Sequence, residues 1–214
     1  MHMRRPFAVL ICSCLILFCL STRALAQPAV SFGFQGGLNF ADASTSPNYE
    51  SISSRTGAMF GAQFEVALSD FLSIQPELFD IQKGAVFSGT TEGASGRSTW
   101  KIDYAELVIL LKAKFGSTQF KPFVFAGPNI GIKTNAEAVV ELGTLSETTD
   151  LKDKIESTDI ALDFGIGGEY QMDSTAALVG SIRYSHGFSD INKDNTASWK
   201  SYGVQVVVGV KFSL

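Results

Sequence analysis

The sequence predicts an all-β protein: a closed antiparallel eight-stranded up-and-down transmembrane β-barrel, preceded by a cleavable helical signal peptide. Three observations support this fold class. The C-terminal residues alternate between apolar and small or polar side chains, the connections between such segments are alternately long and short, and the N-terminus has the parts of an export signal.

The clearest alternation lies at the C-terminus. Every second residue from 202 to 214 is apolar: Tyr202, Val204, Val206, Val208, Val210, Phe212 and Leu214. Val207 is the only large apolar residue at an intervening position. Because neighbouring side chains of a strand point to opposite faces, one apolar face continues for about 40 Å at about 3.3 Å per residue. That length exceeds the usual globular strand and is typical of a strand that crosses a lipid bilayer.

The first 26 residues form the predicted signal peptide. Arg4 and Arg5 precede an apolar run over 7–20, and small residues lead up to a predicted cleavage between Ala26 and Gln27. An uncleaved anchor is the alternative, but about 14 apolar residues are fewer than the about 20 that a spanning helix needs. We therefore divide the chain into a signal peptide, 1–26, and an outer-membrane barrel domain, 27–214.

The predicted cleavage also decides the cysteine chemistry. All three cysteines, Cys12, Cys14 and Cys19, lie in the signal peptide, so the remaining 188 residues have no thiol and form no disulfide. A lipoprotein cut before Cys19 would need a small residue just upstream, where the chain has the bulky Phe18.

Charge and composition exclude several classes of function. Without the signal peptide, 14 basic residues stand against 21 acidic ones, whereas a nucleic-acid partner needs a basic surface. No uncharged apolar run of 18 residues follows the signal, which argues against spanning helices. Neither a metal-ligand cluster nor a phosphate or nucleotide motif is present, so we expect no cofactor and no metal.

The first four predicted strands are 30–40, 56–68, 72–83 and 99–115. In the first two, apolar residues, many of them phenylalanine, alternate with glycine, glutamine and other small or polar residues. The third alternates until Phe79, Asp80 and Ile81 reverse its phase, which predicts a β-bulge there. The fourth alternates up to Phe115, although Val108 and Leu110 make its polar side partly apolar.

The other four predicted strands are 122–133, 158–172, 176–188 and 199–214. Segment 158–172 is as regular as the last one, with Ile160, Leu162 and Phe164 opposite carboxylates and glycines. The connections 41–55, 84–98, 134–157 and 189–198 are long, whereas 69–71, 116–120 and 173–175 are short. Long external loops and tight periplasmic turns are typical of bacterial outer-membrane barrels, which indicates that cellular location.

Alternation alone does not say which face is inside, so a soluble barrel with an apolar pocket, like a lipocalin, is the alternative. The polar face is rich in glycine rather than lysine and glutamate, and small residues suit the narrow lumen of eight strands. Aromatic residues also predict two belts at the lipid interfaces: Phe71, Phe115, Phe123, Tyr170 and Phe212 near the short turns, and Trp100, Tyr104, Tyr184, Phe188, Trp199 and Tyr202 near the long loops.

Four segments resemble the PorT-like family of outer-membrane barrels: LSIQPELFDIQKGA (72–85), KIDYAELVILLKAKF (101–115), KPFVFAGPNIGI (121–132) and SIRYSHGFSDI (181–191). The resemblance covers nearly all of the chain after the signal. It accounts for Pro76 and Pro128 inside predicted strands, because QPE and AGP recur in that family. The chain departs from the family pattern at Asp80-Ile81, at Val108 and at the terminal Leu214. The family implies a location more than an activity.

The polar face predicts a cluster of charges inside the lumen: Glu65, Glu77, Glu106, Lys112, Lys114, Asp163, Glu169, Arg183 and Lys211. Buried charges are costly unless they are paired, so we interpret this set as a structural ion-pair plug that fills the lumen. The alternative is a narrow, gated ion path.

We expect no enzymatic activity. His186 is the only histidine after the signal, and Ser185 beside it would point to the opposite face of a strand, so the two do not form a catalytic pair. His186 has the phase of the lipid-facing side chains, near the external rim.

Two external segments carry weaker signals. Asp190, Asn192 and Asp194 resemble the start of a calcium loop, but Ser201 stands where the bidentate glutamate belongs, so a turn-rich loop is favoured. Segment 134–157 is acidic, either as a solvated loop or as a surface that binds an external partner or divalent cations.

Taken together, the sequence predicts a structural or surface-interaction barrel that acts through four external loops; the alternative is a low-conductance channel or an accessory factor in protein export. Expected partners are outer-membrane lipid, the barrel-assembly machinery, and an extracellular or envelope protein.

Overall fold

The structure is a computed structural model that describes residues 29–46, 52–91, 94–116, 119–143, 145–193 and 198–214. The predicted signal peptide and its cleavage site between Ala26 and Gln27 lie outside these residues. Within the described part of the chain, no helix is both long and apolar enough to cross a membrane.

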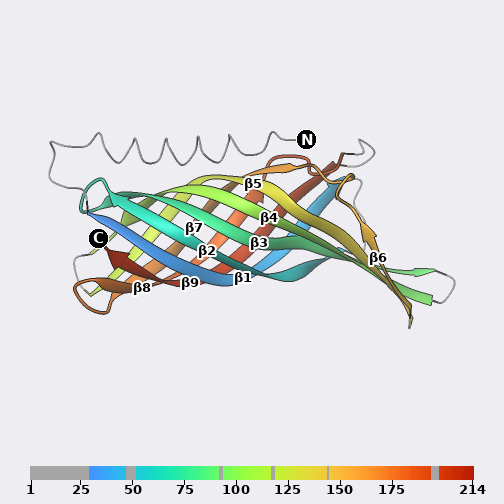
Figure 1. The fold of residues 1–214 in the computed structure, drawn as a ribbon, viewed down its shortest axis with the longest axis horizontal. Coiled ribbons are helices and arrows are strands. Elements are labelled where there is room, and N and C mark those ends of the chain that lie inside the picture. Colours follow the sequence, from blue (N-terminus) through green and yellow to red (C-terminus); the bar gives the residue numbers. More distant parts are fainter. Residues whose placement is uncertain (1–28, 47–51, 92–93, 117–118, 144, 194–197) are drawn as a thin grey trace, which may run out of the picture.

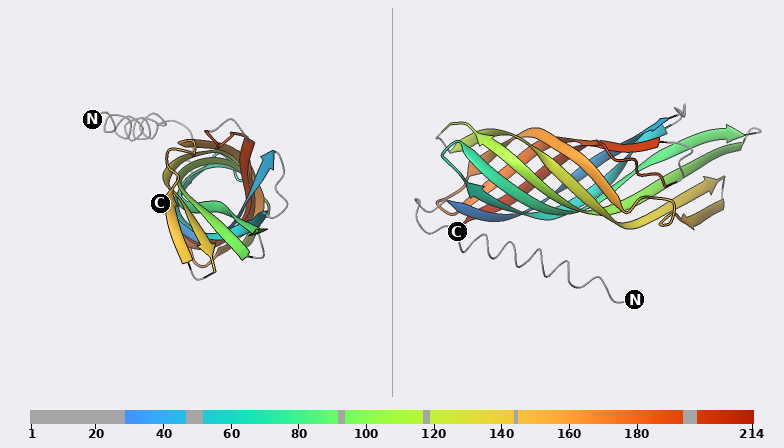
Figure 2. Two further views of the ribbon diagram at one scale, coloured as in Figure 1. Left: turned by 90° about the vertical axis from the view of Figure 1, so that its right-hand side faces the viewer. Right: turned by 90° about the horizontal axis from the view of Figure 1, so that it is seen from above.

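Nine antiparallel strands form one sheet in the order β4-β3-β2-β1-β9-β8-β7-β5-β6. β4 also pairs with β5, and this pairing closes eight strands into a ring, seen end-on in the left view of Figure 2. The short β6 is added to β5 outside the ring. The strands are β1 (Val30–Ser46), β2 (Ile52–Ala67), β3 (Leu72–Thr91), β4 (Ala94–Lys114), β5 (Phe120–Leu142), β6 (Leu145–Asp150), β7 (Thr158–Gln171), β8 (Ala176–Gly187) and β9 (Ser198–Ser213). The predicted eight-stranded up-and-down barrel is confirmed.

Tight connections gather at one end of the barrel. Ser69 Oγ accepts a hydrogen bond from Leu72 N at 3.0 Å, and Asp173 Oδ1 accepts one from Thr175 N at 2.7 Å. At the same end, β9 closes against the start of β1, where Leu214 N donates to Val30 O at 2.9 Å. The short turns therefore lie where the sequence predicts them.

Most strands at the opposite end are longer than predicted, so the predicted limits of the loops 41–55, 84–98 and 134–157 are wrong. The limits of 189–198 agree with the structure, because β8 ends at Gly187 and β9 begins at Ser198. Most of 84–98 belongs to the β3–β4 hairpin, and 134–150 is mostly strand, divided between β5 and the unpredicted β6. Figure 1 shows these strands projecting beyond the ring at its right-hand end. Beyond the membrane the outer face of a strand contacts water instead of lipid, so the contrast between apolar and polar positions that marks the spanning residues as strand is weaker there.

The predicted bulge at Phe79, Asp80 and Ile81 is also wrong. β3 pairs with β4 from Leu72↔Ala113 to Thr91↔Ala94 without a shift of register. Phe79 and Ile81 are buried inside the ring, whereas Asp80 is exposed on the outside. The phase therefore never reverses; the lumen accepts apolar side chains at these positions.

Inward-facing glycines allow both the tight curvature and the packing of rings in the lumen. A Cβ on Gly167 would lie 2.3 Å from Phe123 Cζ, and one on Gly165 would lie 2.7 Å from Phe125 Cζ. Each ring thus occupies the space above a glycine of the neighbouring strand. Glycine and aromatic partners of this kind shape strongly curved sheets. Curvature of the sheet and packing of these rings therefore explain why the polar face is rich in glycine.

Large apolar side chains cover the outside of the ring. Phe60 is 65% exposed, Ile166 63% and Val208 64%. Glu65, Asp163 and Lys211 on the same strands lie inside, which is the reverse of a soluble barrel with an apolar pocket. A surface of this kind is stable in hydrocarbon rather than water.

The predicted aromatic belts are only partly correct. Phe71, Phe115, Tyr170, Phe188 and Phe212 are exposed on the outside. Phe123 and Tyr104 instead point into the lumen, and Trp100 and Trp199 pack against the buried core. The pattern failed here because an aromatic side chain fills a narrow lumen as well as it anchors an interface.

Candidate functional site

All nine charged residues predicted for the lumen point into it. Lys114 is partly buried, and the other eight are buried: Glu65, Glu77, Glu106, Lys112, Asp163, Glu169, Arg183 and Lys211. The structure brings these side chains together in three groups stacked along the barrel, which we name the basal, central and outer clusters. The basal cluster is nearest the short turns.

Three lysines surround two glutamates in the basal cluster. Lys211 Nζ lies 3.0 Å from Glu65 Oε2 and 2.7 Å from Glu169 Oε2. Lys112 Nζ lies 3.2 Å from Glu65 Oε2 and also pairs with Glu169, and Lys114 pairs with Glu65. These side chains come from β2, β4, β7 and β9, so the cluster crosses the lumen.

Arg183 forms the central cluster with two carboxylates. Its Nη2 lies 2.8 Å from Glu77 Oε2, and its Nη1 lies 3.5 Å from Asp163 Oδ2. The guanidinium carbon lies 5.4 Å from the ring centre of Phe79 and 5.3 Å from that of Phe125, within the range of cation–π attraction. β3 and β8 lie opposite each other in the ring of eight, so the pair of Arg183 and Glu77 joins opposite walls.

Lys83 is the cation of the outer cluster. Its Nζ pairs with Glu106 and lies 3.1 Å from Asp159 Oδ2. Asn129 Nδ2 donates to Glu106 Oε2 at 2.9 Å and to Asp163 Oδ2 at 3.1 Å, which links the outer cluster to the central one. The three clusters together form a column of polar contacts along the barrel.

Sequence reasoning missed Lys83 and Asp159. Asp159 has the same phase as the predicted Asp163, so the alternation of 158–172 could have identified it. Lys83 was hidden by the predicted bulge, because a phase reversal after Leu78 would turn it outward. With the alternation of β3 unbroken, Lys83 points inward and is 6% exposed.

Of the two residues considered for catalysis, His186 lies apart from the clusters, whereas Ser185 hydrogen-bonds to Asp163 of the central cluster. His186 is exposed on the outside, where its ring contacts Phe188 at 5.2 Å between centroids, whereas Ser185 is buried inside. The two side chains therefore lie on opposite faces, as predicted.

Of the residues that resemble a calcium loop, Asp190 and Asn192 are described, and they form part of a turn. Asp190 Oδ1 accepts hydrogen bonds from Asn192 N at 3.0 Å and Trp199 N at 2.9 Å. Asp194 lies outside the described residues. Among those described, no group of three or more histidine, cysteine, aspartate or glutamate side chains is arranged to hold a metal ion.

Comparison with known proteins identifies the family. The model of the outer membrane protein beta-barrel domain family matches residues 25–193. The chain belongs to this family. The protein is therefore located in the bacterial outer membrane, and the apolar outer surface of this outer-membrane barrel faces lipid.

Solved structures of other outer-membrane barrels share the fold of this family member. Neisserial surface protein A has a TM-score of 0.50 and 17% identity, over 86% of this chain and 97% of its own. OprG from Pseudomonas aeruginosa has a TM-score of 0.51 and 14% identity, over 88% of this chain and 98% of its own. A major outer membrane protein from Thermus thermophilus has a TM-score of 0.54 and 11% identity, over 87% of this chain and 100% of its own. At such identities the likeness concerns the fold alone. No match was found among curated proteins.

Proposed function

We propose that this outer-membrane barrel is a non-enzymatic protein with a closed lumen, which acts at the cell surface through the strands that project beyond the membrane. The main support for a closed lumen is the ion pair of Arg183 and Glu77, in which Nη2 and Oε2 from opposite walls lie 2.8 Å apart. The basal and outer clusters add further side chains above and below it.

The energetics of these clusters favour a permanent plug over an open path. Transfer of each charge out of water costs several kcal/mol, and only close pairing and hydrogen bonds offset that cost. Arg183 and Lys112 both have two carboxylate partners. An ion that passes through the lumen would have to break these pairs, so the clusters oppose conduction.

The external strands are the proposed surface for a partner. β6 pairs with β5 from Glu137↔Asp150 to Leu142↔Leu145, and its six residues are all exposed. Glu141, Glu147 and Asp150 give this hairpin a negative charge. We infer an extracellular or envelope protein with a basic surface as its partner, with lipid around the barrel and the barrel-assembly machinery engaged during insertion.

The motifs at 72–85, 101–115, 121–132 and 181–191 support placement of this barrel among PorT-like proteins within the family.

Photo-crosslinking in intact cells tests the surface role. A photoreactive amino acid in place of Thr148, on β6, should give a discrete adduct of higher mass, and the same group in place of Asp70, in a short turn, should not give that adduct. The combined change Glu141→Gln, Glu147→Gln and Asp150→Asn should abolish the adduct. Absence of any adduct at position 148, or an adduct that survives the neutralised hairpin, would contradict the proposal.

A further inference from the structure

β6 has a free edge. It is the last strand in the order of the sheet, so among the described residues only β5 lies beside it. The register of the two strands runs without a shift over the whole of β6. All six residues of β6 are exposed, and Figure 1 shows the strand at the projecting end of the barrel. The backbone of β6 is therefore accessible from the side that faces away from β5.

The hydrogen bonds to β5 show which backbone groups point to this free edge. Just beyond β6, Leu151 N donates to Ala136 O at 3.0 Å. In an antiparallel pair, opposite residues alternate between pairs that bond to each other and pairs that do not. The odd-numbered residues of β6 therefore bond to β5, whereas Ser146, Thr148 and Asp150 turn their N–H and C=O groups to the free edge. No described residue bonds to these backbone groups.

The edge of β6 lacks the usual obstacles to strand pairing. Proteins often protect an exposed edge with proline, lysine or a β-bulge, and β6, with the sequence LSETTD, has none of these. Its threonines favour extended backbone. Its six residues span about 20 Å at about 3.3 Å each, the length of an ordinary strand. The edge is thus long enough for a further strand.

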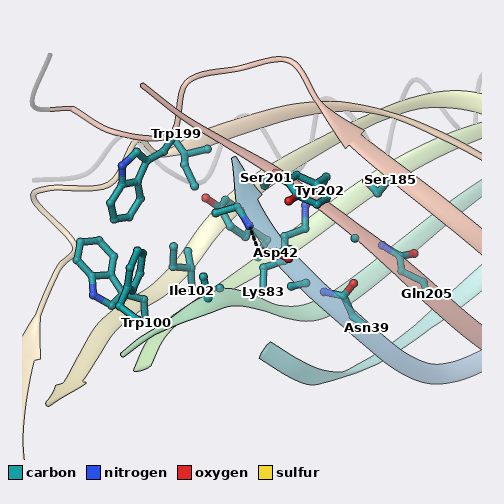
Figure 3. Close-up of a pocket in the computed structure, with 18 residues that line it drawn as sticks. Asn39, Asp42, Lys83, Trp100, Ile102, Ser185, Trp199, Ser201, Tyr202 and Gln205 are labelled. Carbon is teal, nitrogen blue, oxygen red and sulfur yellow. Dashed lines mark hydrogen bonds between the residues drawn. The ribbon is translucent and has the colours of Figure 1, made fainter. Parts of the chain in front are cut away.

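The mouth side of the external sheet is less available than this edge. Ala136 and Ala138 of β5 are buried in the cluster against which Trp100 and Trp199 pack. Figure 3 shows the two tryptophans together at the mouth, where their ring centroids lie 4.5 Å apart. The chain itself therefore covers the mouth side of the sheet, and the edge of β6 is left for backbone pairing with another molecule.

The charge of β6 selects between possible occupants of the edge. β6 has two carboxylates, Glu147 and Asp150, and no basic residue. Lys152, which pairs with Asp150 at 3.8 Å, is exposed, so this pair contributes little. A second copy of the chain would bring the same carboxylates to the edge, and like charges on neighbouring strands repel. A basic segment of another protein is attracted instead.

We propose that the partner of this barrel binds by strand addition: an extended, basic segment of another protein pairs with Ser146, Thr148 and Asp150 and continues the external sheet beyond β6. In this mode backbone hydrogen bonds supply affinity, and side chains at alternate positions supply specificity. The inference rests on the proposed surface function and adds the backbone edge as the element that is recognised.

Peptide binding to the purified barrel tests strand addition. The probe is a fluorescent peptide as long as β6 in which lysine and threonine alternate, and its anisotropy is measured with the folded barrel in uncharged detergent. One control replaces lysine by glutamate; the other keeps the lysines but has every backbone amide N-methylated, so it has the same charge and cannot pair as a strand. We expect saturable binding of the probe and at least about tenfold weaker binding of both controls. Equal binding of either control, or no binding of the probe, would overturn the proposal.

Two substitutions of Thr148 locate the site on the edge. Thr148→Pro removes the N–H that points to the edge, and an edge strand tolerates proline, so the barrel should fold and bind the probe about tenfold more weakly. Thr148→Val keeps that N–H and the shape of the side chain, and should leave the affinity unchanged. Heat-dependent gel mobility verifies that both variants fold. Undiminished binding to Thr148→Pro, or an equal loss with Thr148→Val, would show that the backbone edge is not the site.

The crosslinking experiment in cells separates failure of this inference from failure of the proposed function. An adduct at position 148, together with no binding of the peptide probe, would leave the surface role standing and refute strand addition. An adduct at twice the mass of the barrel would identify a second copy as the occupant and refute the basic partner. Absence of any adduct would contradict both the surface role and strand addition.

Discussion

Replacement of Arg183 by methionine should lower the free energy of unfolding of the barrel by about 3–5 kcal/mol, the usual result of removing one partner from a buried ion pair. Glu77 and Asp163 would then remain inside the barrel without their cation. The measurement is a urea titration in lipid vesicles, followed by the gel mobility of unboiled samples, in which folded barrels migrate differently from unfolded chains.

Two further variants show whether the loss of stability comes from the two carboxylates that are left without a cation. Addition of Glu77→Gln and Asp163→Asn to Arg183→Met should recover part of the lost stability, because the two charges that need a cation are gone. Lys101→Met is the exposed control: its pair with Glu137 at 3.4 Å is accessible to water, so the loss should be at most about 1 kcal/mol. Equal losses for Arg183 and Lys101 would show that Arg183 contributes no more to stability than an exposed charge.

Gly127→Ala should lower the stability by at least about 2 kcal/mol, since the added methyl group meets backbone rather than a movable side chain. A Cβ on Gly127 would lie 1.9 Å from Ile109 O and 2.9 Å from Leu110 Cα, so β4 and β5 would have to separate. This is the contact that closes the ring. The same urea titration measures the loss.

Gly180→Ala is the matched control on the outside of the ring. A Cβ there has no described atom within 4 Å, so the substitution should be neutral or stabilising by up to about 1 kcal/mol. The stabilisation would come from the lower conformational entropy of the unfolded chain with alanine. If both alanines prove harmless, the close approach of β4 and β5 at Gly127 does not limit the fold.

The part of the fold in contact with lipid could be predicted from the sequence because lipid and lumen impose a strict contrast on alternate residues. Val204 to Phe212 shows this contrast directly, and the eight strands of the ring followed from it. Outside the lipid the contrast weakens, so the extensions of β3, β4 and β5 and all of β6 were taken for loops. The error at Phe79 has a different reason: its side chain is apolar and yet lies inside, because the lumen accepts apolar as well as polar side chains.

Much of the candidate site was predictable for the same reason, since inward phase alone placed residues such as Glu65, Arg183 and Lys211 in the lumen. Their pairing was not predictable, because tilt and stagger decide which depths of opposite strands meet. The pocket at the external mouth, which Lys83, Trp100 and Trp199 line, was missed because the two tryptophans were assigned to the lipid interface. Only the three-dimensional arrangement shows that they meet across the mouth.

The closed lumen is the central claim, and single-channel recording in a planar bilayer tests it most directly. The folded barrel, with insertion verified by its heat-dependent gel mobility, should show no conductance steps under applied voltage, because paired side chains cross the lumen between opposite walls. Reproducible steps from the wild-type protein, altered in size by Arg183→Ala, would show that ions pass through the charged column and would contradict the plug.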